Sequence, residues 1–480
     1  MTRIAGCPFS RVVSGWAIAG AVCLLAPLCP RLAHAVGHSI GREQRRAIAP
    51  NQPVVGPLCT VRVGQNPALV AIDARDQRIF VANEGPLTFD YALPTQPGSV
   101  SVIDGRTGAV LRTVRVGQGP VSLAFDAPTG RVFVLCTGRI NTVSGFMSRG
   151  GSVSVLDAAT GALLRTLPVG PTLLTISGPG TTPTGRQALA VDSASGRVYV
   201  ATSAKVLVDG TTGAVRRTIS VRGGITPSVI APSVIAVDGR ARRLYMGDSG
   251  DTTMPFVPSS SVSGLFGVLD AATGKGIANV AVTQSGISVI AVDERAGRVL
   301  VFELHGNREY STVVYVLDAR SGKLLHTTDL GVPSDGGVAV GVEIATGRIF
   351  VLYTPSDYEF QNGAVDRQID ILDARSGKLL RTVHLPTTTN QGFFISRVVT
   401  VDERDNRVLV AVTQGQFTEE KGQTVIASDV YVLDARSGAI MRSLQVGPGP
   451  QDVAIDEVAR RVFVTNERSG TLSVFDAAQL

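Results

Sequence analysis

VSLAFDAPTGRVFVLC at 121–136 and GSVSVLDAATGALLRTLPVG at 151–170 together make up one structural unit of this chain. Four apolar, valine-rich runs alternate in it with short turns that carry Asp, Thr, Pro or Gly, a pattern typical of β-strands. We predict four strands, at Val121 to Asp126, Arg131 to Cys136, Ser152 to Asp157 and Ala162 to Val169. These are the first to fourth strands of a unit. The first two are almost continuously apolar, which predicts burial between neighbouring sheets.

The unit is repeated along most of the chain. Eight times an acidic residue closes a first strand and an arginine opens the second strand five positions later. Such a repeat indicates one supersecondary module copied around a ring or along a stack. We expect each pair to form a cross-strand ion pair at a tight turn. The pairs are Asp73/Arg78, Asp126/Arg131, Asp192/Arg197, Asp238/Arg243, Asp293/Arg298, Glu343/Arg348, Asp402/Arg407 and Asp456/Arg461.

A second turn, between the third and fourth strands, reads Asp-x-x-(Thr/Ser)-Gly in seven units. The Asp side chain can accept hydrogen bonds from the turn amides, and the Gly can adopt the positive φ of a tight turn. A structural role is therefore predicted. Metal binding by these acidic residues is the alternative, but each has its own arginine and turn to satisfy it, so we predict no metal site. The turns span Asp104 to Gly108, Asp157 to Gly161, Asp209 to Gly213, Asp270 to Gly274, Asp318 to Gly322, Asp373 to Gly377 and Asp434 to Gly438.

The two ends of the repeat predict how it closes. The eighth unit stops at Leu480 without a fourth strand, and Val54 to Val63 (VVGPLCTVRV) matches the fourth strands of the other units. Pairing the first strand of the chain with the last removes the open edges of a linear stack. The predicted fold is therefore an all-β, eight-bladed β-propeller of four-stranded blades, closed by the N-terminal strand, which completes the last blade.

Three segments are predicted. Residues 1–35 combine Arg3 and Arg11 with an apolar stretch and end in Ala33-His34-Ala35, which indicates a secretory signal peptide cleaved after Ala35. An uncleaved membrane anchor is the alternative. Residues 36–53 form a polar spacer, and 54–480 form a single propeller. We expect an exported protein, periplasmic, cell-surface or extracellular, with no membrane span once the signal is removed, and a monomer.

Charge and cysteine content narrow the classes of partner. Three of the 45 basic residues and none of the 39 acidic residues lie in the leader, so the mature chain carries a net charge of only +3. A nucleic-acid partner is not expected, because it requires basic side chains clustered on one face. The mature chain keeps two cysteines, Cys59 and Cys136, in units that are not neighbours, and we expect both to be free thiols.

Two strand sequences carry a family resemblance. IFVAN (79–83) and VFVTN (462–466), the latter followed by SGTLSVFDA (469–477), resemble the YVTN-type β-propeller repeat of bacterial periplasmic and archaeal surface-layer proteins. The resemblance covers residues 54–480. It implies an exported propeller scaffold but no particular reaction, because propellers host many unrelated activities. The third to seventh units replace the Asn of the motif with Ser203, Asp248, Glu303, Tyr353 and Thr413.

No cofactor is predicted. The only tryptophan, Trp16, lies in the leader, so the Trp that docks one sheet on the next in quinoprotein propellers is missing. No histidines or cysteines have metal-ligand or haem-attachment spacing. His305 is the sole candidate for catalysis, and a lone loop histidine is more often a solvated surface residue. We therefore assign no catalytic residue and no metal ligand.

The loops that join second to third and fourth to first strands emerge on one face, and they are long and dissimilar. Insertions confined to one face of a repeat array commonly mark its binding surface, and exposed aromatic residues are typical anchors. Packing of these rings onto the blades is the alternative. The candidate binding residues are Phe89, Tyr91, Phe146, Phe256, Tyr310, Tyr358, Phe360, Phe393, Phe394 and Phe417.

The predicted function is a non-enzymatic binding or interaction module for an unidentified protein or small-molecule ligand. The alternative is a lactonase-like or other hydrolase with its site at the mouth of the central channel. Polar residues expected at that mouth are Asn66, Gln187, Asp335, Arg397, Gln451 and Asp452. A cluster of carboxylates there would favour the enzyme, and an apolar, aromatic rim would favour the binding module.

Overall fold

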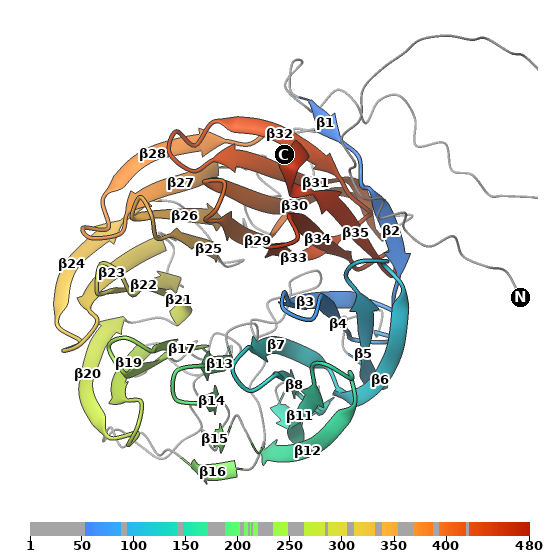
Figure 1. The fold of residues 1–480 in the computed structure, drawn as a ribbon. Coiled ribbons are helices and arrows are strands. Elements are labelled where there is room, and N and C mark those ends of the chain that lie inside the picture. The colour runs from blue at the N-terminus through green and yellow to red at the C-terminus, as the bar shows by residue number, and fades with distance from the viewer. Residues whose placement is uncertain are drawn as a thin grey trace, which may run out of the picture.

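The chain folds into a ring of β-sheets (Figure 1). A computed structural model describes residues 53–87, 94–141, 147–170, 188–201, 206–209, 212, 215–218, 234–247, 264–283, 287–304, 312–331, 338–353, 368–386, 393–418 and 422–480. Within these residues, no helix is both long and apolar enough to cross a lipid bilayer.

Each blade of the ring is named by its innermost strand, which is the first strand of the blade. The second, third and fourth strands follow outward from it. The first three blades contain β3 (Pro67–Asp73), β4 (Arg78–Asn83), β5 (Pro97–Asp104) and β6 (Val110–Gln118); β7 (Pro120–Asp126), β8 (Arg131–Cys136), β11 (Gly151–Asp157) and β12 (Leu163–Gly170); and β13 (Leu189–Asp192), β14 (Arg197–Val200), β15 (Val206–Asp209) and β16 (Val215–Thr218).

The next three blades contain β17 (Val234–Asp238), β18 (Arg243–Gly247), β19 (Gly264–Asp270) and β20 (Gly276–Thr283); β21 (Ile287–Asp293), β22 (Arg298–Leu304), β23 (Thr312–Asp318) and β24 (Leu324–Asp329); and β25 (Val338–Glu343), β26 (Arg348–Tyr353), β27 (Gln368–Asp373) and β28 (Leu379–His384).

The remaining sheets hold both ends of the described chain. One contains β29 (Phe393–Asp402), β30 (Arg407–Thr418), β31 (Gly422–Asp434), β32 (Ile440–Gln445) and β1 (Val54–Val55). The other contains β33 (Pro450–Asp456), β34 (Arg461–Asn466), β35 (Thr471–Asp476) and β2 (Cys59–Arg62). A small hairpin of β9 (Arg139–Asn141) and β10 (Met147–Arg149) lies between β8 and β11, and a 3₁₀ turn, η2 (Ala477–Gln479), follows β35.

The prediction of eight blades of four strands was wrong. Among the described residues, seven blades, not eight, consist of four antiparallel strands. The β29 sheet has five strands, because β1 joins its outer edge in parallel, Val54 opposite Ser443 and Val55 opposite Leu444. The single strand predicted at Val54 to Val63 is therefore two strands in different sheets. Gly56 and Pro57 separate them, and Pro57 has no N–H to donate to a sheet.

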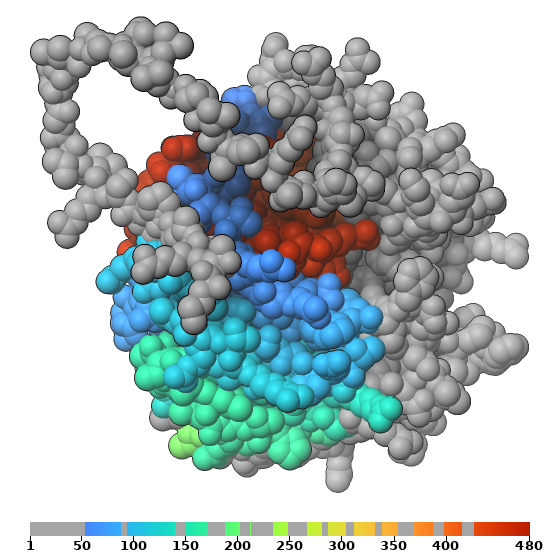
Figure 2. Space-filling model, turned by 90° about the vertical axis from the view of Figure 1, so that its right-hand side faces the viewer, coloured from blue at the N-terminus to red at the C-terminus, as the bar shows by residue number. Residues whose placement is uncertain are grey.

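The N-terminal segment meets the C-terminal strands in the β33 blade. Strand β2 is antiparallel to β35, with Cys59 opposite Val474 and Arg62 opposite Thr471. Figure 2 shows these N-terminal residues, in blue, lying directly against the C-terminal residues, in red. The inner strands β33 and β3 also lie side by side, so the ring has no open sheet at this point.

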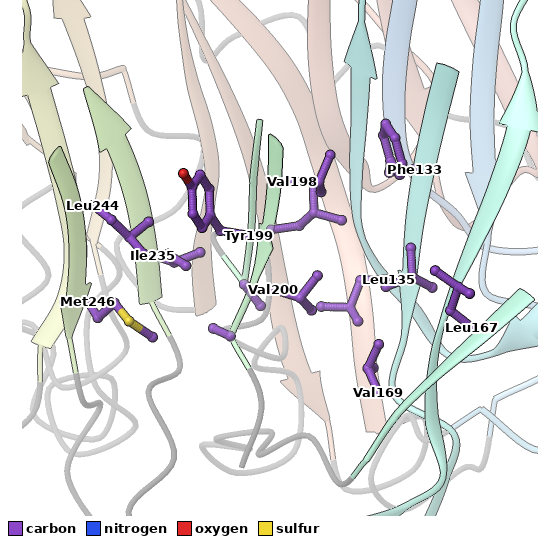
Figure 3. Close-up of a cluster of buried hydrophobic side chains, with 14 of the residues drawn as sticks. Phe133, Leu135, Leu167, Val169, Val198, Tyr199, Val200, Ile235, Leu244 and Met246 are labelled. Atoms are coloured by element: carbon purple, nitrogen blue, oxygen red, sulfur yellow. The ribbon is translucent and has the colours of Figure 1, made fainter. Parts of the chain in front are cut away.

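Apolar side chains from facing sheets fill the space between blades. Figure 3 shows one such layer, in which residues of the β7 blade meet residues of the β13 blade, and these in turn meet the β17 blade. The β-branched and aromatic residues that favour strands are the same residues that pack between sheets. The labelled side chains are Phe133, Leu135, Leu167 and Val169; Val198, Tyr199 and Val200; and Ile235, Leu244 and Met246.

The repeated Asp–Arg pairs do not form the ion pairs that the sequence predicted. Asp73 Oδ1 accepts hydrogen bonds from the turn amides of Arg75 and Asp76. Arg78 lies opposite both Asp73 and Asp104, and its Nη1 is 3.0 Å from Asp104 Oδ2. In four blades the second-strand arginine lies within 4 Å of the Asp that begins the Asp-x-x-(Thr/Ser)-Gly turn, because the first-strand Asp is engaged by its own turn. Arg348 and Arg407 instead donate to the Ala435 and Ala477 carbonyls of the next blade.

Side chains of the second strand also tie neighbouring blades together. Tyr199 Oη donates to the Ala271 carbonyl of the next blade at 2.6 Å, and Tyr245 Oη donates to Ala319 in the same way. Burial raises the pKa of Tyr199 to about 12. These alanines follow the turn Asp and are buried. The same carbonyl position, in Ala435, accepts from Arg348 at 3.1 Å, so this buried carbonyl is a repeated acceptor between neighbouring blades.

The two cysteines of the ring differ in their bonding state. Cys136 is a free, fully buried thiol, and burial raises its pKa to about 12. Cys59 is disulfide-bonded. The expectation of two free thiols was therefore wrong for Cys59.

Candidate functional site: the long-loop face

The long-loop face is the side of the ring on which second strands lead to third strands and fourth strands lead to the next blade. Most of the aromatic residues predicted to bind a partner lie outside the described residues: Phe89, Tyr91, Phe146, Phe256, Tyr310, Tyr358 and Phe360. The backbones of Phe393 and Phe394 lie in β29 and that of Phe417 in β30, but their side chains are not described. The structure therefore leaves this set of binding residues as a prediction.

Three neighbouring blades, β33, β3 and β7, are entered on this face by short and similar connections from the preceding fourth strand. Each is entered through a Val-Gly-x-x-Pro segment, at 63–67, 116–120 and 446–450. The segment pairs with the residues that follow the second strand: Glu84 N donates to Asn66 O at 2.9 Å, Thr137 N to Gly119 O at 2.9 Å, and Glu467 N to Gly449 O at 2.8 Å. The backbone groups of this arc are thus satisfied by one another.

The Asn of the repeat explains the glycine of that segment. Asn83 is fully buried, and its Nδ2 donates to Ser101 Oγ at 3.1 Å. A Cβ on Gly64 would lie 2.6 Å from Asn83 Cγ, so only glycine fits above the carboxamide. Asn466 repeats the arrangement, with Nδ2 2.9 Å from Ser473 Oγ. The Asn therefore holds the second strand to the third and is not a free ligand.

Other side chains occupy the Asn position in the remaining blades. The register places Cys136, Glu303, Tyr353 and Val412 there. The sequence analysis assigned Thr413 to this position, but Thr413 lies one residue after it. Val412 is the equivalent residue, because it pairs with Asp429 as Asn83 pairs with Ser99. Ser203 and Asp248 lie outside the described residues.

Two of these replacements bring carboxylates into the space between blades. Glu303 is fully buried and accepts a hydrogen bond from Tyr315 Oη at 2.6 Å. Asp370, also fully buried, accepts from Tyr353 Oη at 2.8 Å, from Thr382 Oγ1 at 2.6 Å and from Gln368 Nε2 at 3.3 Å. Burial raises the pKa of Tyr353, so it remains a donor. Sequence reasoning noted Glu303 as a replacement of the Asn but did not predict its bond to Tyr315, and it missed Asp370, which stands where Ser101 and Ser473 stand in other blades.

The β30–β31 hairpin extends well beyond the ends of the other strands. Its pairing continues from Arg407 opposite Asp434 to Thr418 opposite Gly422. Asp429 lies at the base of this extension, between Val412 and Gln445 on the adjacent strands. Its carboxyl is largely buried, and burial alone raises the pKa of Asp429 to about 6.

Replacing Asp429 with Asn is expected to stabilise the protein above pH 6. The folded carboxyl has a raised pKa, so its favourable contribution is complete below the unfolded pKa of about 4 and is lost as the pH rises to about 6. We expect Asp429→Asn to increase the free energy of unfolding by about 1–2 kcal/mol at pH 8. At pH 4 the two proteins should unfold alike. Urea unfolding at both pH values measures this, and equal stabilities at pH 8 would contradict it.

The polar residues described at the mouth of the channel bond to other residues of the ring. Asn66 Nδ2 donates to Gly85 O at 2.6 Å, and Gln451 Nε2 donates to Glu467 Oε2. Asp452 Oδ2 accepts from Val70 N at 3.0 Å and so joins the last inner strand to the first. Gln187 and Asp335 lie outside the described residues, and only the backbone of Arg397 is described.

The described residues hold no group of three or more His, Cys, Asp or Glu side chains arranged to bind a metal ion. Of the carboxylates that the sequence places at this mouth, Asp452 accepts a backbone hydrogen bond, and Asp335 lies outside the described residues.

Comparison with known proteins supports the architecture. No protein-family model and no curated protein matches the chain. Three solved structures match most of it. The Dos1 propeller matches at a TM-score of 0.58 and 12% identity, over 88% of this chain and 94% of its own. The fold is a β-propeller. The computationally designed Ika8 protein matches at 0.52 and 15% (89% and 100%), and BamB from Moraxella catarrhalis at 0.50 and 14% (88% and 99%). At these identities the β-propeller likeness establishes fold alone.

Proposed function

We propose that this β-propeller is an exported, non-enzymatic binding module that engages its partner through the long-loop face. The chief support comes from the hydrogen bonds of the channel-mouth residues. Asn66, Gln451 and Asp452 all make contacts within the ring, so they are structural where a hydrolase would need them directed at a substrate. Loops on a rigid scaffold are where binding residues concentrate.

The form of the face also supports the proposal. The β33, β3 and β7 blades are entered through short connections whose backbone groups bond to one another, and the β30–β31 hairpin extends beyond the ends of the other described strands. An irregular surface of this kind suits recognition of a shaped partner better than it suits a reaction. The resemblance of residues 79–83 and 462–466 to YVTN repeats, together with the leader-like residues 1–35, supports export.

Removing aromatic side chains from this face is expected to abolish binding without unfolding the ring. We would replace Tyr91, Phe146, Tyr358 and Phe417 with Ala together. Loop side chains contribute little to the stacked sheets, whereas interface aromatics can each contribute about 2 kcal/mol or more to a complex. The partner is first identified by affinity capture with the mature protein and mass spectrometry, and binding and melting temperature are then measured for both proteins.

The matched control replaces Asp157 and Asp434 with Ala on the opposite face. Asp434 Oδ1 accepts from Ser437 Oγ and Ser437 N, both at 2.6 Å, and these bonds lower the pKa of Asp434. This variant should lose stability and keep the partner. If the aromatic variant unfolds instead, those rings pack the loops onto the blades, and the proposed binding face is wrong.

A further inference from the structure

The opposite, tight-turn face carries a second feature that the proposed function does not use. Two adjacent blades turn between their third and fourth strands with the same sequence, Arg-Ser-Gly-Lys-Leu-Leu, at 320–325 and 375–380. Arg320, Lys323, Arg375 and Lys378 are exposed. So are three leucines beside them: Leu324 is 42% exposed, Leu379 47% and Leu380 54%. Together these two turns form what we name the basic rim.

The acidic residues of the basic rim accept hydrogen bonds from residues of their own turns. Asp318 Oδ1 accepts from Ser321 N at 2.9 Å and from Ser321 Oγ at 2.7 Å, and Asp373 Oδ1 accepts from Ser376 at 2.8 and 2.7 Å. Asp318 also lies 3.8 Å from Arg298 of its own blade. The charges presented to solvent are therefore the arginines and lysines.

The positive charge extends over neighbouring turns of the same face. The turns at 238–243, 270–276, 293–298, 318–324, 343–348 and 373–381 contain 12 Lys and Arg against seven Asp and Glu. These turns are joined, because Arg243 Nε donates to Arg320 O at 2.9 Å and Arg295 Nη1 to Ala345 O at 3.4 Å. Their outer strands β20, β24 and β28 follow one another along the edge of the ring (Figure 1). A net charge of +5 is thus concentrated on three adjacent blades of a chain whose total is +6.

We propose that the basic rim docks on an anionic lipid bilayer. Basic side chains near such a surface are attracted to the headgroups, and exposed leucines between them can enter the interface. A nucleic acid or an acidic protein would account for the charges, but a polyphosphate backbone makes no use of paired leucines. The surface lies opposite the long-loop face, so docking would leave that face directed away from the membrane. This inference is independent of the proposed function.

Sedimentation with lipid vesicles tests the proposal on the full chain. Vesicles of phosphatidylcholine alone are compared with vesicles that also contain phosphatidylglycerol, and the readout is the binding added by the anionic lipid. Lys323→Glu with Lys378→Glu should weaken that binding by at least about tenfold, because each basic residue near an anionic surface adds attraction. Leu379→Ser with Leu380→Ser should weaken it severalfold and keep the native melting temperature.

The β7 blade offers a matched control with the same turn but no lysine. Leu163→Ser with Leu164→Ser removes two leucines of similar exposure, 42% and 50%, from DAATGALLRT and should leave binding unchanged. Arg139→Glu with Arg468→Glu reverses two exposed charges on the long-loop face and should also have no effect. The N-terminal residues 1–52 are the same in every variant, so their own affinity for lipid cancels.

Three outcomes would overturn the proposal. One is a failure of the anionic lipid to increase binding. Another is an equal loss in the control variants. The third is a loss in the lysine variant with none in the leucine variant, which would indicate a polyanion or an acidic protein as the partner.

Discussion

A chain that begins at Gly64 is expected to be less stable than one that begins at Val36 by at least about 3 kcal/mol. The shorter chain lacks β2, whose Val61 is buried among Val70, Ile79 and Leu472. Burial of one valine contributes about 1.5–3 kcal/mol, and the lost strand also supplied hydrogen bonds to β35 along Cys59–Arg62. Urea unfolding curves, monitored by circular dichroism, measure the difference in the free energy of unfolding.

A chain that begins at Pro57 is the control, because it keeps β2 and loses β1. Strand β1 pairs at two positions only and adds one hydrogen bond, from Ser443 N to Pro53 O at 3.3 Å. Its loss should lower the free energy of unfolding by about 1 kcal/mol or less. All three chains lack the cysteines before Cys59, so the comparison does not depend on its disulfide. Equal stability of the Gly64 and Pro57 chains would show that β2 does not close the ring.

Replacing Asp370 with Ala is expected to destabilise the protein by about 3–5 kcal/mol. The change leaves Tyr353 Oη, Thr382 Oγ1 and Gln368 Nε2 without their shared acceptor between two packed blades. Buried donors without a partner lose the full free energy of desolvation. Thermal and urea unfolding of Asp370→Ala measure the loss.

Tyr353→Phe provides the matched comparison, since it removes one donor and keeps the carboxylate. It should lower the free energy of unfolding by about 1 kcal/mol. In the double variant Tyr353→Phe with Asp370→Ala, part of the loss should be recovered, because one stranded donor is gone. Strict additivity of the two changes would argue against a shared network.

The repeated residues predicted the local structure well. Each described turn between third and fourth strands lies where an Asp and a Gly mark it, and the segment at Cys59–Arg62 was recognised as a missing fourth strand because it matches the other fourth strands. A residue that recurs in every unit indicates a local structural requirement, such as a turn. Repetition does not show which of two carboxylates opposite an arginine forms the ion pair. Arg78 was therefore predicted to pair with Asp73, although it pairs with Asp104.

Features that occur once were not predictable from the repeat. Val54 and Val55 join a neighbouring sheet through backbone hydrogen bonds, which leave no periodic signal in the sequence. Glu303 replaces the Asn of the repeat and Asp370 replaces the Ser of the third strand, and the role of each depends on a tyrosine contributed by another strand. Most candidate binding residues are in sequence insertions that differ between units, and Phe393, Phe394 and Phe417 lie in the extended ends of β29 and β30, so nothing in the repeat constrains them.

The pairing of β2 with β35 has a consequence for the order of folding. Cys59 lies opposite Val474, so a strand that is synthesised early has its partner about 415 residues later. At 5–20 residues per second, the ribosome adds the intervening residues in about 20–80 s. During that time β2 and the inner edge of β3 have no partner in the last blade. The nascent ring is therefore an open arc with two exposed sheet edges, and chaperone protection matters most before residues 471–476 emerge.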